Sequence, residues 1–314
     1  MVKYFVFPVE RGSLVGSKSS YGAQPGIFIA YCFDSPESAS FRANIEAAIR
    51  KTAALAEIDI TDGHVPVGAS WPTVVRQRIE RGKLVVADLT VLSPEVLFEC
   101  GFAWGLGRPI LPVTKTSAHR ANVPEWLTDI QFGYFSSESG LKAIVDSIYL
   151  HISARRRKAR SVSDAAHPRR VVLLGGAEST NEIHDKVSAA CAKWGLDFYP
   201  QIRNIADLQS IDSDVAQDSA HASLLIGELH GGRSDSFVHF ASGAVLAVPT
   251  AGASSKRLHK RVLLIVDPQD LNSGLAPVSA RKVRNVHVIN RDQLNQHLQE
   301  YGKQFREWEK KQDS

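Results

Sequence analysis

Glu99 is the residue whose type and surroundings point most directly to chemistry. It lies in the segment VVADLTVLSPEVLFECGFAWGLGRPILPV, residues 85–113, between Phe98 and Cys100 in the most apolar helix that the sequence predicts. A carboxylate among apolar side chains loses hydration, which raises its pKa and its reactivity toward an electrophilic carbon. Such a group can stabilise or capture the oxocarbenium-like centre that forms when a glycosidic bond breaks. The alternative is a buried carboxylate held by backbone N–H groups or an arginine, with no chemical role.

Polar residues also stand where two predicted strands end. Asp62 and Asp88 close the second and third strands of the pattern, at the edge where open α/β sheets bind ligands. We expect both carboxylates to orient ribose hydroxyls, although a turn role is the alternative for Asp62. Ser93 is expected to cap the helix of Glu99 and to contact substrate from the same crevice.

Two aromatic residues end the first predicted strand. Tyr31 and Phe33 lie in the stretch IFIAYCFD. At the carboxyl end of a strand their rings can stack on a base, whereas burial in the core is the alternative. Together with Glu99, they outline a predicted site for a small nucleoside or nucleotide. No metal site is expected, because His221, His230 and His239 lack ligand spacing.

Alternating strands and helices must position these residues. A short strand is predicted at Tyr4–Phe7, before a Gly/Ser-rich loop. Continuous apolar runs then predict strands that are buried on both faces of a parallel sheet. The expected strands are 27–33, 58–60, 84–87 and 110–113, and the expected helices are 35–55, 73–81, 94–106 and 141–153. Serine followed by proline starts two of these helices, at residues 35–36 and 93–94.

The pattern then repeats, which predicts a diverged tandem pair of α/β domains. The second copy is expected to hold strands at 171–177, 196–199, 224–227 and 262–266 and a helix at 181–194. The aligned pairs are Asp88 with Glu228, Phe98 with Phe240, Glu99 with Ala241, and Gly101 with Gly243. The first copy spans 1–152, a basic linker 153–170, the second copy 171–290, and an amphipathic helix 291–314. The apolar stripe of that helix predicts a core contact or a dimer surface.

Composition limits the possible environments and partners. The chain has 314 residues, a net charge of +4 and three cysteines without metal or disulfide spacing, which predicts reduced core thiols in a cytoplasmic protein. No apolar run is long enough for a membrane helix, so no membrane association is expected. The mild charge does not indicate nucleic-acid binding. We interpret the linker as a solvated tether, with a nucleotide-contacting arm as the alternative.

The segment from Ala87 to Thr114 resembles nucleoside 2-deoxyribosyltransferase-like and Toll/interleukin-1 receptor (TIR)-like proteins. In that family, D-x-T is followed by N-x-N-V-x-Y-E-L-G-x-A-x-x-x-G-K-P. The matching residues here are Asp88, Thr90, Val96, Phe98, Glu99, Gly101, Ala103, Gly107, Arg108 and Pro109, and the resemblance covers about residues 27–115.

The resemblance implies tandem flavodoxin-like doubly wound domains and an N-glycosidase in which Glu99 is the nucleophile. It implies NAD, or a nucleoside or nucleotide, as substrate, with no cofactor, and a homo-oligomeric antiviral defence effector that depletes NAD. Ser93 stands where the deoxyribosyltransferases place an acid, which favours hydrolysis of NAD or a nucleotide over base exchange. The second copy is expected to regulate, sense a ligand or assemble. A nucleotide-binding sensor without turnover, or a scaffold, remains the alternative.

Overall fold

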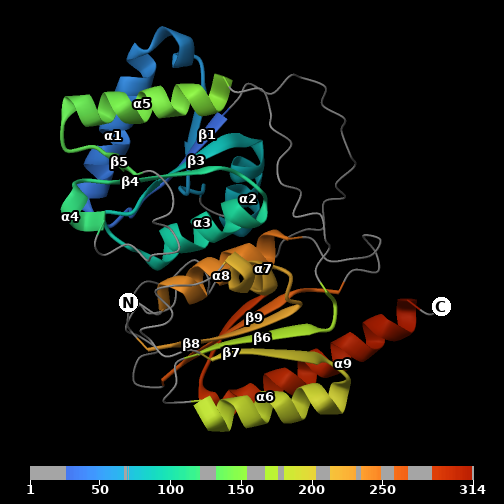
Figure 1. The fold of residues 1–314 in the computed structure, drawn as a ribbon. Helices are drawn as coiled ribbons and strands as arrows, with labels where there is room; N and C mark the ends of the chain where they lie inside the picture. The colour runs from blue at the N-terminus through green and yellow to red at the C-terminus, as the bar shows by residue number, and fades with distance from the viewer. Residues whose placement is uncertain are drawn as a thin grey trace.

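The described residues fold into two parallel five-stranded sheets, and helices cover both faces of each sheet (Figure 1). The structure is a computed structural model. It describes residues 26–66, 69, 71–120, 132–153, 167–175, 180–202, 213–230, 235–248, 258–267 and 285–312. The strand predicted at Tyr4–Phe7, most of the basic linker and the last two residues of the strand predicted at 171–177 lie outside these residues.

The first sheet has the strand order β2-β1-β3-β4-β5. Its strands are β1 (Gly26–Ala30), β2 (Asp59–Asp62), β3 (Gly82–Asp88), β4 (Ile110–Thr114) and β5 (Gly133–Tyr134). This order is that of flavodoxin-like folds, in which ligands bind at the carboxyl ends of the strands. Along β1, Ile27 and Ile29 face one layer of helices, whereas Phe28 and Ala30 face the other.

The second sheet repeats this arrangement, in the order β7-β6-β8-β9-β10. Its strands are β6 (Arg170–Gly175), β7 (Asp197–Ile202), β8 (Leu224–Leu229), β9 (Arg261–Val266) and β10 (Val286–Ile289). The first strand of each half pairs with the second and the third, all in parallel. The chain is therefore a tandem pair of flavodoxin-like doubly wound domains, as the sequence predicts.

The helices form four layers around the two sheets. Residue bounds are α1 (Pro36–Lys51), α2 (Trp71–Arg81), α3 (Pro94–Gly105), α4 (Ser117–Arg120), α5 (Glu138–Ser153), α6 (Thr180–Trp194), α7 (Ser213–Ala220), α8 (Asp235–Ala247) and α9 (Leu294–Gln312), with short 3₁₀ turns η1 (Ala53–Leu55) and η6 (Arg291–Gln293). From top to bottom in Figure 1, the layers are α1 and α5, the first sheet, α2 and α3, α7 and α8, the second sheet, and α6 and α9.

Helices α3 and α8 pack against each other and join the two domains. A Cβ at Gly101 would overlap the Phe240 carbonyl oxygen, and a Cβ at Gly243 would overlap the Phe98 carbonyl oxygen. The contacts are reciprocal because the sequence repeat aligns Gly101 with Gly243 and Phe98 with Phe240. The two halves thus meet through equivalent surfaces, as the subunits of a two-fold dimer do. One buried apolar cluster runs through both domains across this contact; it includes Phe28, Phe98, Leu225 and Phe240.

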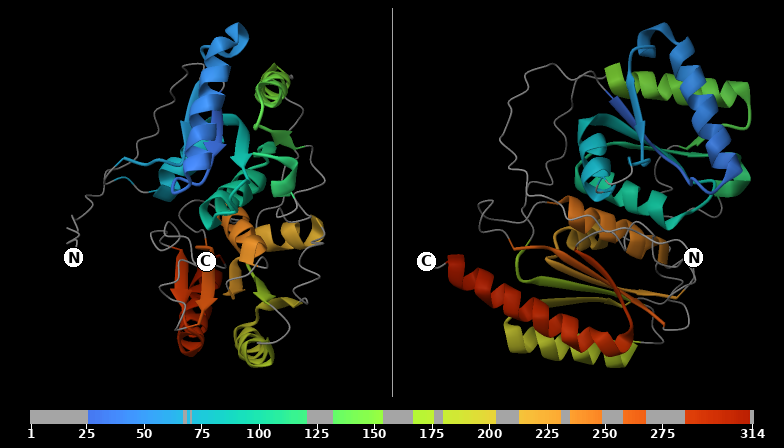
Figure 2. Two further views of the ribbon diagram at one scale, coloured as in Figure 1. Left: turned by 90° about the vertical axis from the view of Figure 1, so that its left-hand side faces the viewer. Right: turned by 180° about the vertical axis from the view of Figure 1, so that it is seen from behind.

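The C-terminal helix covers the second domain. Its apolar stripe, Leu294, Leu298, Tyr301 and Phe305, is buried in one cluster with residues of α6 and the second sheet. Figure 2, seen from behind, shows α6 and α9 side by side on the outer face of that sheet. The Tyr301 hydroxyl donates a hydrogen bond to Ser223 Oγ at 2.7 Å. The sequence predicted either a core contact or a dimer surface for this stripe, and the structure shows a core contact.

Several boundaries differ from the sequence-based expectations. The first strand ends at Ala30, so Tyr31 and Phe33 lie in the following loop rather than in the strand. The predicted helix 35–55 is divided at Thr52, whose N–H closes α1 on the Ile49 carbonyl before η1 begins. The sequence analysis did not identify α4, β5, α7 or β10, each of which has eight residues or fewer. Cys100 and Cys191 are buried as expected, whereas Cys32 is half-buried; all three are free thiols. No described helix combines the length and hydropathy needed to cross a bilayer.

Candidate functional site

The site is built around the first turns of α3. The Ser93 hydroxyl accepts a hydrogen bond from the Val96 N–H at 3.2 Å, and Pro94 occupies the first helical position, so the helix begins where the sequence predicts. Glu99 follows on the side of the helix that faces the carboxyl ends of the first two strands. Glu99 is only 2% exposed, and the neighbouring positions of the helix are apolar.

The loop after β2 closes over the Glu99 carboxylate. Gly63 belongs to that loop, and a Cβ added there would overlap Glu99 Oε1 and lie 3.2 Å from Phe33 Cζ. The absence of a side chain at residue 63 therefore leaves the space that the carboxylate occupies. Three segments meet at this point: the loop after β1, the loop after β2, and α3.

Aromatic rings form the outer wall of the site. The Tyr31 and Phe33 rings pack edge to face with centroids 4.6 Å apart, and the Phe33 and His64 ring centroids are 4.1 Å apart. Phe33 is 38% exposed, whereas Tyr31 is nearly buried. Phe33 and His64 thus present aromatic surface to solvent next to a buried carboxylate, an arrangement in which a planar base can stack.

Asp62 holds the loop rather than pointing into open space. Its Oδ2 accepts a hydrogen bond from Arg42 Nε at 3.2 Å, and its Oδ1 accepts one from the His64 N–H at 3.0 Å. Arg78 donates to the Asp62 carbonyl oxygen at 2.7 Å and to the His64 carbonyl. Two arginines from flanking helices therefore fix the loop that carries Gly63 over Glu99.

The electrostatic environment favours the neutral form of Glu99. Burial raises its pKa well above the ordinary value of 4.5, and the negative charges of Glu95 and Asp62 raise it further. The pKa of the Tyr31 phenol is also raised, first by burial and then by Asp62. Burial and these two charges thus favour the protonated form of Glu99, whereas a positive charge brought close to it by a ligand would favour the carboxylate.

Asp88 and Ser93 take structural roles at the same end of the sheet. Asp88 is 0% exposed, and its Oδ1 accepts the Thr90 N–H at 2.9 Å, while Thr90 Oγ1 in turn accepts the Lys115 N–H at 2.8 Å. The expectation that Asp88 opens onto a crevice is therefore wrong, because its turn buries the carboxylate. Ser93 caps α3 with its hydroxyl and is also buried.

The structure thus brings four of the six predicted residues together: Glu99, Tyr31, Phe33 and Asp62. The sequence analysis did not include Gly63, Arg42 or His64 in the site. The His64 side chain is exposed, and its ring packs on Phe33. The signal for this loop was the sequence TDGH directly after a strand, where a glycine beside an aspartate permits close approach of a side chain.

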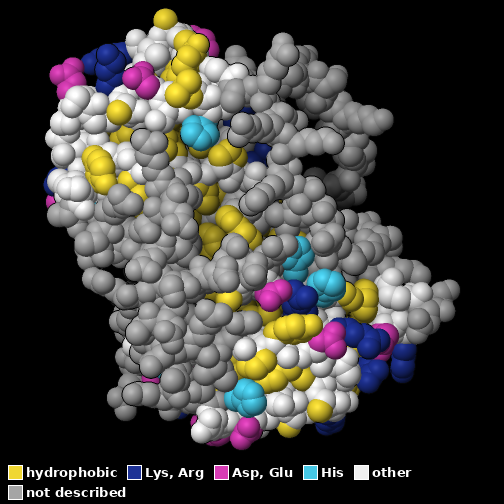
Figure 3. All heavy atoms as spheres, in the orientation of Figure 1, with side chains coloured by type: hydrophobic (Ala, Val, Ile, Leu, Met, Phe, Trp, Pro, Cys, Tyr) yellow, Lys and Arg dark blue, Asp and Glu magenta, His cyan; other side chains and the backbone are white. Residues whose placement is uncertain are grey.

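Neither the surface charge nor the side-chain clusters of the described residues suggest other chemistry here. Figure 3 shows acidic and basic side chains interspersed among the residues coloured on that face, without a broad field of one sign. Among the described residues, no group of three or more His, Cys, Asp or Glu side chains is placed to hold a metal ion.

Comparisons with known proteins do not assign a family. No family profile matches the sequence, and no curated protein matches it either. Similar solved structures include a probable two-component response regulator/GGDEF domain protein, at 14% identity and a TM-score of 0.30, with 90% of this chain and 100% of that chain covered. Another is the glycotransferase of kitacinnamycin, at 10% identity, a TM-score of 0.26, and 91% and 94% coverage. A third is CD0873, a substrate binding protein from Clostridium difficile, at 12% identity, a TM-score of 0.23, and 85% and 99% coverage.

Proposed function

We propose that the first domain cleaves the N-glycosidic bond of NAD or of a related nucleoside or nucleotide, with Glu99 as the catalytic carboxylate. The observation that carries this proposal is the burial of Glu99 directly behind an exposed aromatic surface at the carboxyl ends of β1 and β2. The base would stack on Phe33 and His64, and the sugar would reach the carboxylate once the loop that carries Gly63 moves aside.

The reaction follows from the charge of the site. In NAD the leaving pyridinium ring is cationic, so its approach stabilises the ionised form of Glu99. The C1′–N bond breaks, the electron pair leaves with nicotinamide, and the Glu99 carboxylate stabilises or captures the ribosyl cation. Water then supplies hydroxide to C1′ and a proton to solvent; where an ester to Glu99 has formed, its C1′–O bond breaks and the electron pair returns to the carboxylate, which completes hydrolysis. Neutral leaving bases would need protonation, which makes the cationic substrate the favoured one.

A substrate panel with the purified full chain tests this proposal. NAD, NADP, ribonucleosides and deoxynucleosides would each be incubated with and without a second base, and products separated by chromatography. We expect free nicotinamide from NAD and a loss of at least about 100-fold in Glu99→Gln. Glu80→Gln, an exposed carboxylate on α2, is the matched control. Equal turnover by Glu99→Gln would contradict the proposal.

A nucleotide-binding sensor without turnover is the second candidate. It is favoured by the raised pKa of Glu99, because a neutral carboxylic acid can both donate and accept hydrogen bonds to a ligand. Saturable binding of NAD or a nucleoside that needs Phe33, together with the absence of any product, would support the sensor and exclude the enzyme.

The cellular role in this proposal is NAD depletion by a cytoplasmic, homo-oligomeric defence effector. Expression of the chain in bacteria should lower the NAD content, whereas expression of Glu99→Gln should not. Light scattering during size-exclusion chromatography checks the oligomeric state. A monomer that hydrolyses NAD would refute the oligomer and leave the enzyme proposal intact.

A further inference from the structure

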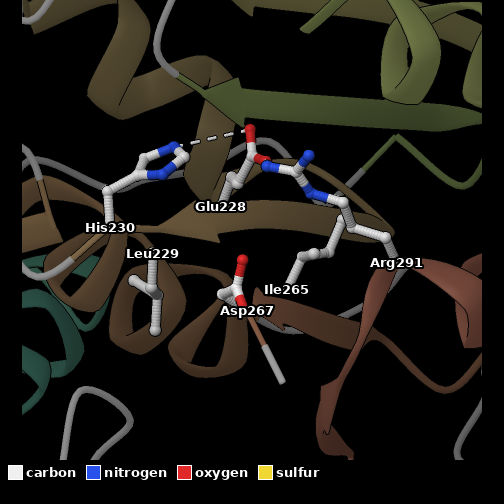
Figure 4. A pocket seen from close by; sticks show the side chains of 6 residues that line it. All are labelled: Glu228, Leu229, His230, Ile265, Asp267 and Arg291. Carbon is white, nitrogen blue, oxygen red and sulfur yellow. Dashed lines mark hydrogen bonds and ion pairs between the residues drawn. The ribbon is translucent and has the colours of Figure 1, made fainter. Parts of the chain in front are cut away.

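A polar cavity lies in the second domain, far along the chain from Glu99. It opens at the carboxyl ends of β8 and β9 and encloses about 120 Å³, room for about four water molecules. Its walls come from β8 and the residue after it, from β9 and the residue after it, and from η6. The lining residues are Glu228, Leu229, His230, Ile265, Asp267 and Arg291, shown in Figure 4.

Charged groups of both signs converge on this cavity. The Glu228 side chain is only 2% exposed; its Oε1 lies 2.8 Å from Arg291 Nη2 and its Oε2 lies 3.5 Å from His230 Nε2. Figure 4 shows the Asp267 carboxylate on the opposite side, pointing toward this pair. The cavity thus offers carboxylate acceptors and N–H donors within one small volume.

The walls are held in place by the fold. The backbone N–H of His230 donates to both carboxylate oxygens of Asp235, at 3.0 and 3.2 Å, at the start of α8. Glu228 is the penultimate residue of a fully buried strand, and Arg291 lies in a turn closed by the reciprocal hydrogen bonds of Asn290 and Gln293. Polar groups on rigid elements that converge on a concave site are characteristic of ligand pockets.

The mixture of charges selects the chemistry of a ligand. An anion would face two carboxylates, Glu228 and Asp267, and a cation would face Arg291 at short range. A neutral ligand with adjacent hydroxyl groups meets neither penalty, since each hydroxyl donates to a carboxylate and accepts from an arginine or histidine N–H. The volume suits a single furanose ring.

We propose that this cavity is a binding site for the vicinal diol of a pentofuranoside, separate from the Glu99 site. An ion pair that served only to stabilise the fold would need no cavity beside it, and a buried pair is weak as a stabilising device. The Arg291 side chain remains 41% exposed, so its donors are accessible from the cavity mouth. The second domain thereby recognises a ligand through Glu228, the residue that the repeat aligns with Asp88.

The test uses the full chain carrying Glu99→Gln, which removes turnover at the first site. Methyl β-D-ribofuranoside, methyl 2-deoxy-β-D-ribofuranoside and inorganic phosphate would be titrated by ligand-observed NMR and calorimetry. We expect saturable binding of the riboside, at least about tenfold weaker binding of the deoxy compound, and none of phosphate.

Variants locate the binding. Asp267→Asn and Glu228→Gln should each weaken riboside binding by at least about tenfold, whereas Asp185→Asn, an exposed carboxylate on α6, should leave it unchanged. If Glu228→Gln does not fold, the comparison of the riboside with its 2-deoxy analogue and the effect of Asp267→Asn still test whether the cavity binds the diol. Equal binding of both glycosides, binding of phosphate, or binding insensitive to Asp267→Asn overturns the proposal. NAD turnover is measured on the unmodified chain. A failure of the proposed N-glycosidase function is therefore distinguished from a failure of riboside binding.

Discussion

Glu99 Oε1 occupies the space that a methyl group on Gly63 would fill. The two residues come from different elements, α3 and the loop after β2, and their contact is what closes the site over the carboxylate. Gly63 is not among the described glycines with positive φ, so a larger residue there changes the space above Glu99 and not the allowed backbone conformation.

Gly63→Ala is therefore expected to displace the carboxylate without altering any charge. We predict a loss of at least about tenfold in NAD turnover, because a misplaced catalytic group loses its advantage of position. The steady-state rate with NAD measures this. Gly26→Ala, where the added Cβ would meet the Asp59 carbonyl oxygen at 3.3 Å, is a control distant from the chemistry. Unchanged turnover in Gly63→Ala would show that the contact does not position Glu99.

Glu95→Gln should shift the pH dependence of turnover. The charge of Glu95 raises the pKa of Glu99, so its removal lowers that pKa and increases the ionised fraction at a given pH. A rate that requires ionised Glu99 rises with pH through this pKa, and the rising limb should move to lower pH in the variant. A pH–rate profile of kcat/KM measures the shift. Glu80→Gln should not move it, and a shift to higher pH in Glu95→Gln would refute the assignment.

Glu99→Gln should stabilise the fold while it abolishes turnover. The folded-state pKa of Glu99 lies above 4.5, so the folded protein holds a proton that the unfolded chain releases. The wild-type stability falls as pH rises from about 4.5 to that raised pKa, by about 1.4 kcal/mol per pH unit, and is unaffected at lower pH.

Urea denaturation from pH 4 to 8 checks this prediction. The advantage of Glu99→Gln over the wild type should be absent at the acidic end and grow with pH. Glu80→Gln should parallel the wild type throughout. If the wild type and Glu99→Gln give parallel curves, then Glu99 is not held in its neutral form by the fold.

Gly101→Ala and Gly243→Ala should damage the contact between the domains. Each added Cβ would overlap a backbone carbonyl of the opposite helix, so α3 and α8 would have to separate. Overpacking of this kind costs about 1–3 kcal/mol in the free energy of unfolding, and we expect each variant to reach at least the upper part of that range.

The double variant provides the internal control. Once one substitution has separated the helices, the second has less packing left to disrupt, so the combined cost should be smaller than the sum. Denaturation of the single and double variants measures the coupling. Strict additivity, or a loss of less than about 0.5 kcal/mol in either single variant, would contradict the reciprocal contact.

The repeat and its strands were predictable because they depend on periodicity. Continuous apolar runs at residues 84–87 and 224–227, placed between helical patterns, favour buried strands of a parallel sheet, and the capping pair Ser93–Pro94 defined the start of α3. Short elements such as β5 and β10 carry too few residues for a period to emerge, and they form because neighbouring strands offer an unpaired edge.

The sequence predicted the central residue of the site, Glu99, but not the loop contacts that surround it. Glu99 stands out because a lone acid in an apolar helix contradicts local preference, which is typical of functional positions. The contact of Glu99 with Gly63 and the tilted packing of His64 on Phe33 arise from loops whose path depends on tertiary structure. Asp88 shows the opposite case, because this carboxylate at a strand end is buried and its Oδ1 accepts the Thr90 N–H of its own turn.

The reciprocal packing of α3 on α8 also limits how the protein can assemble. Each domain buries its most apolar helix, α3 or α8, against the other domain, and the apolar stripe of α9 is buried in the second domain. A second chain that approaches the protein therefore finds neither of these surfaces vacant. Self-association must use a different part of the molecule, and substitutions at Gly101 or Phe305 would change the stability of each chain without acting at a subunit boundary.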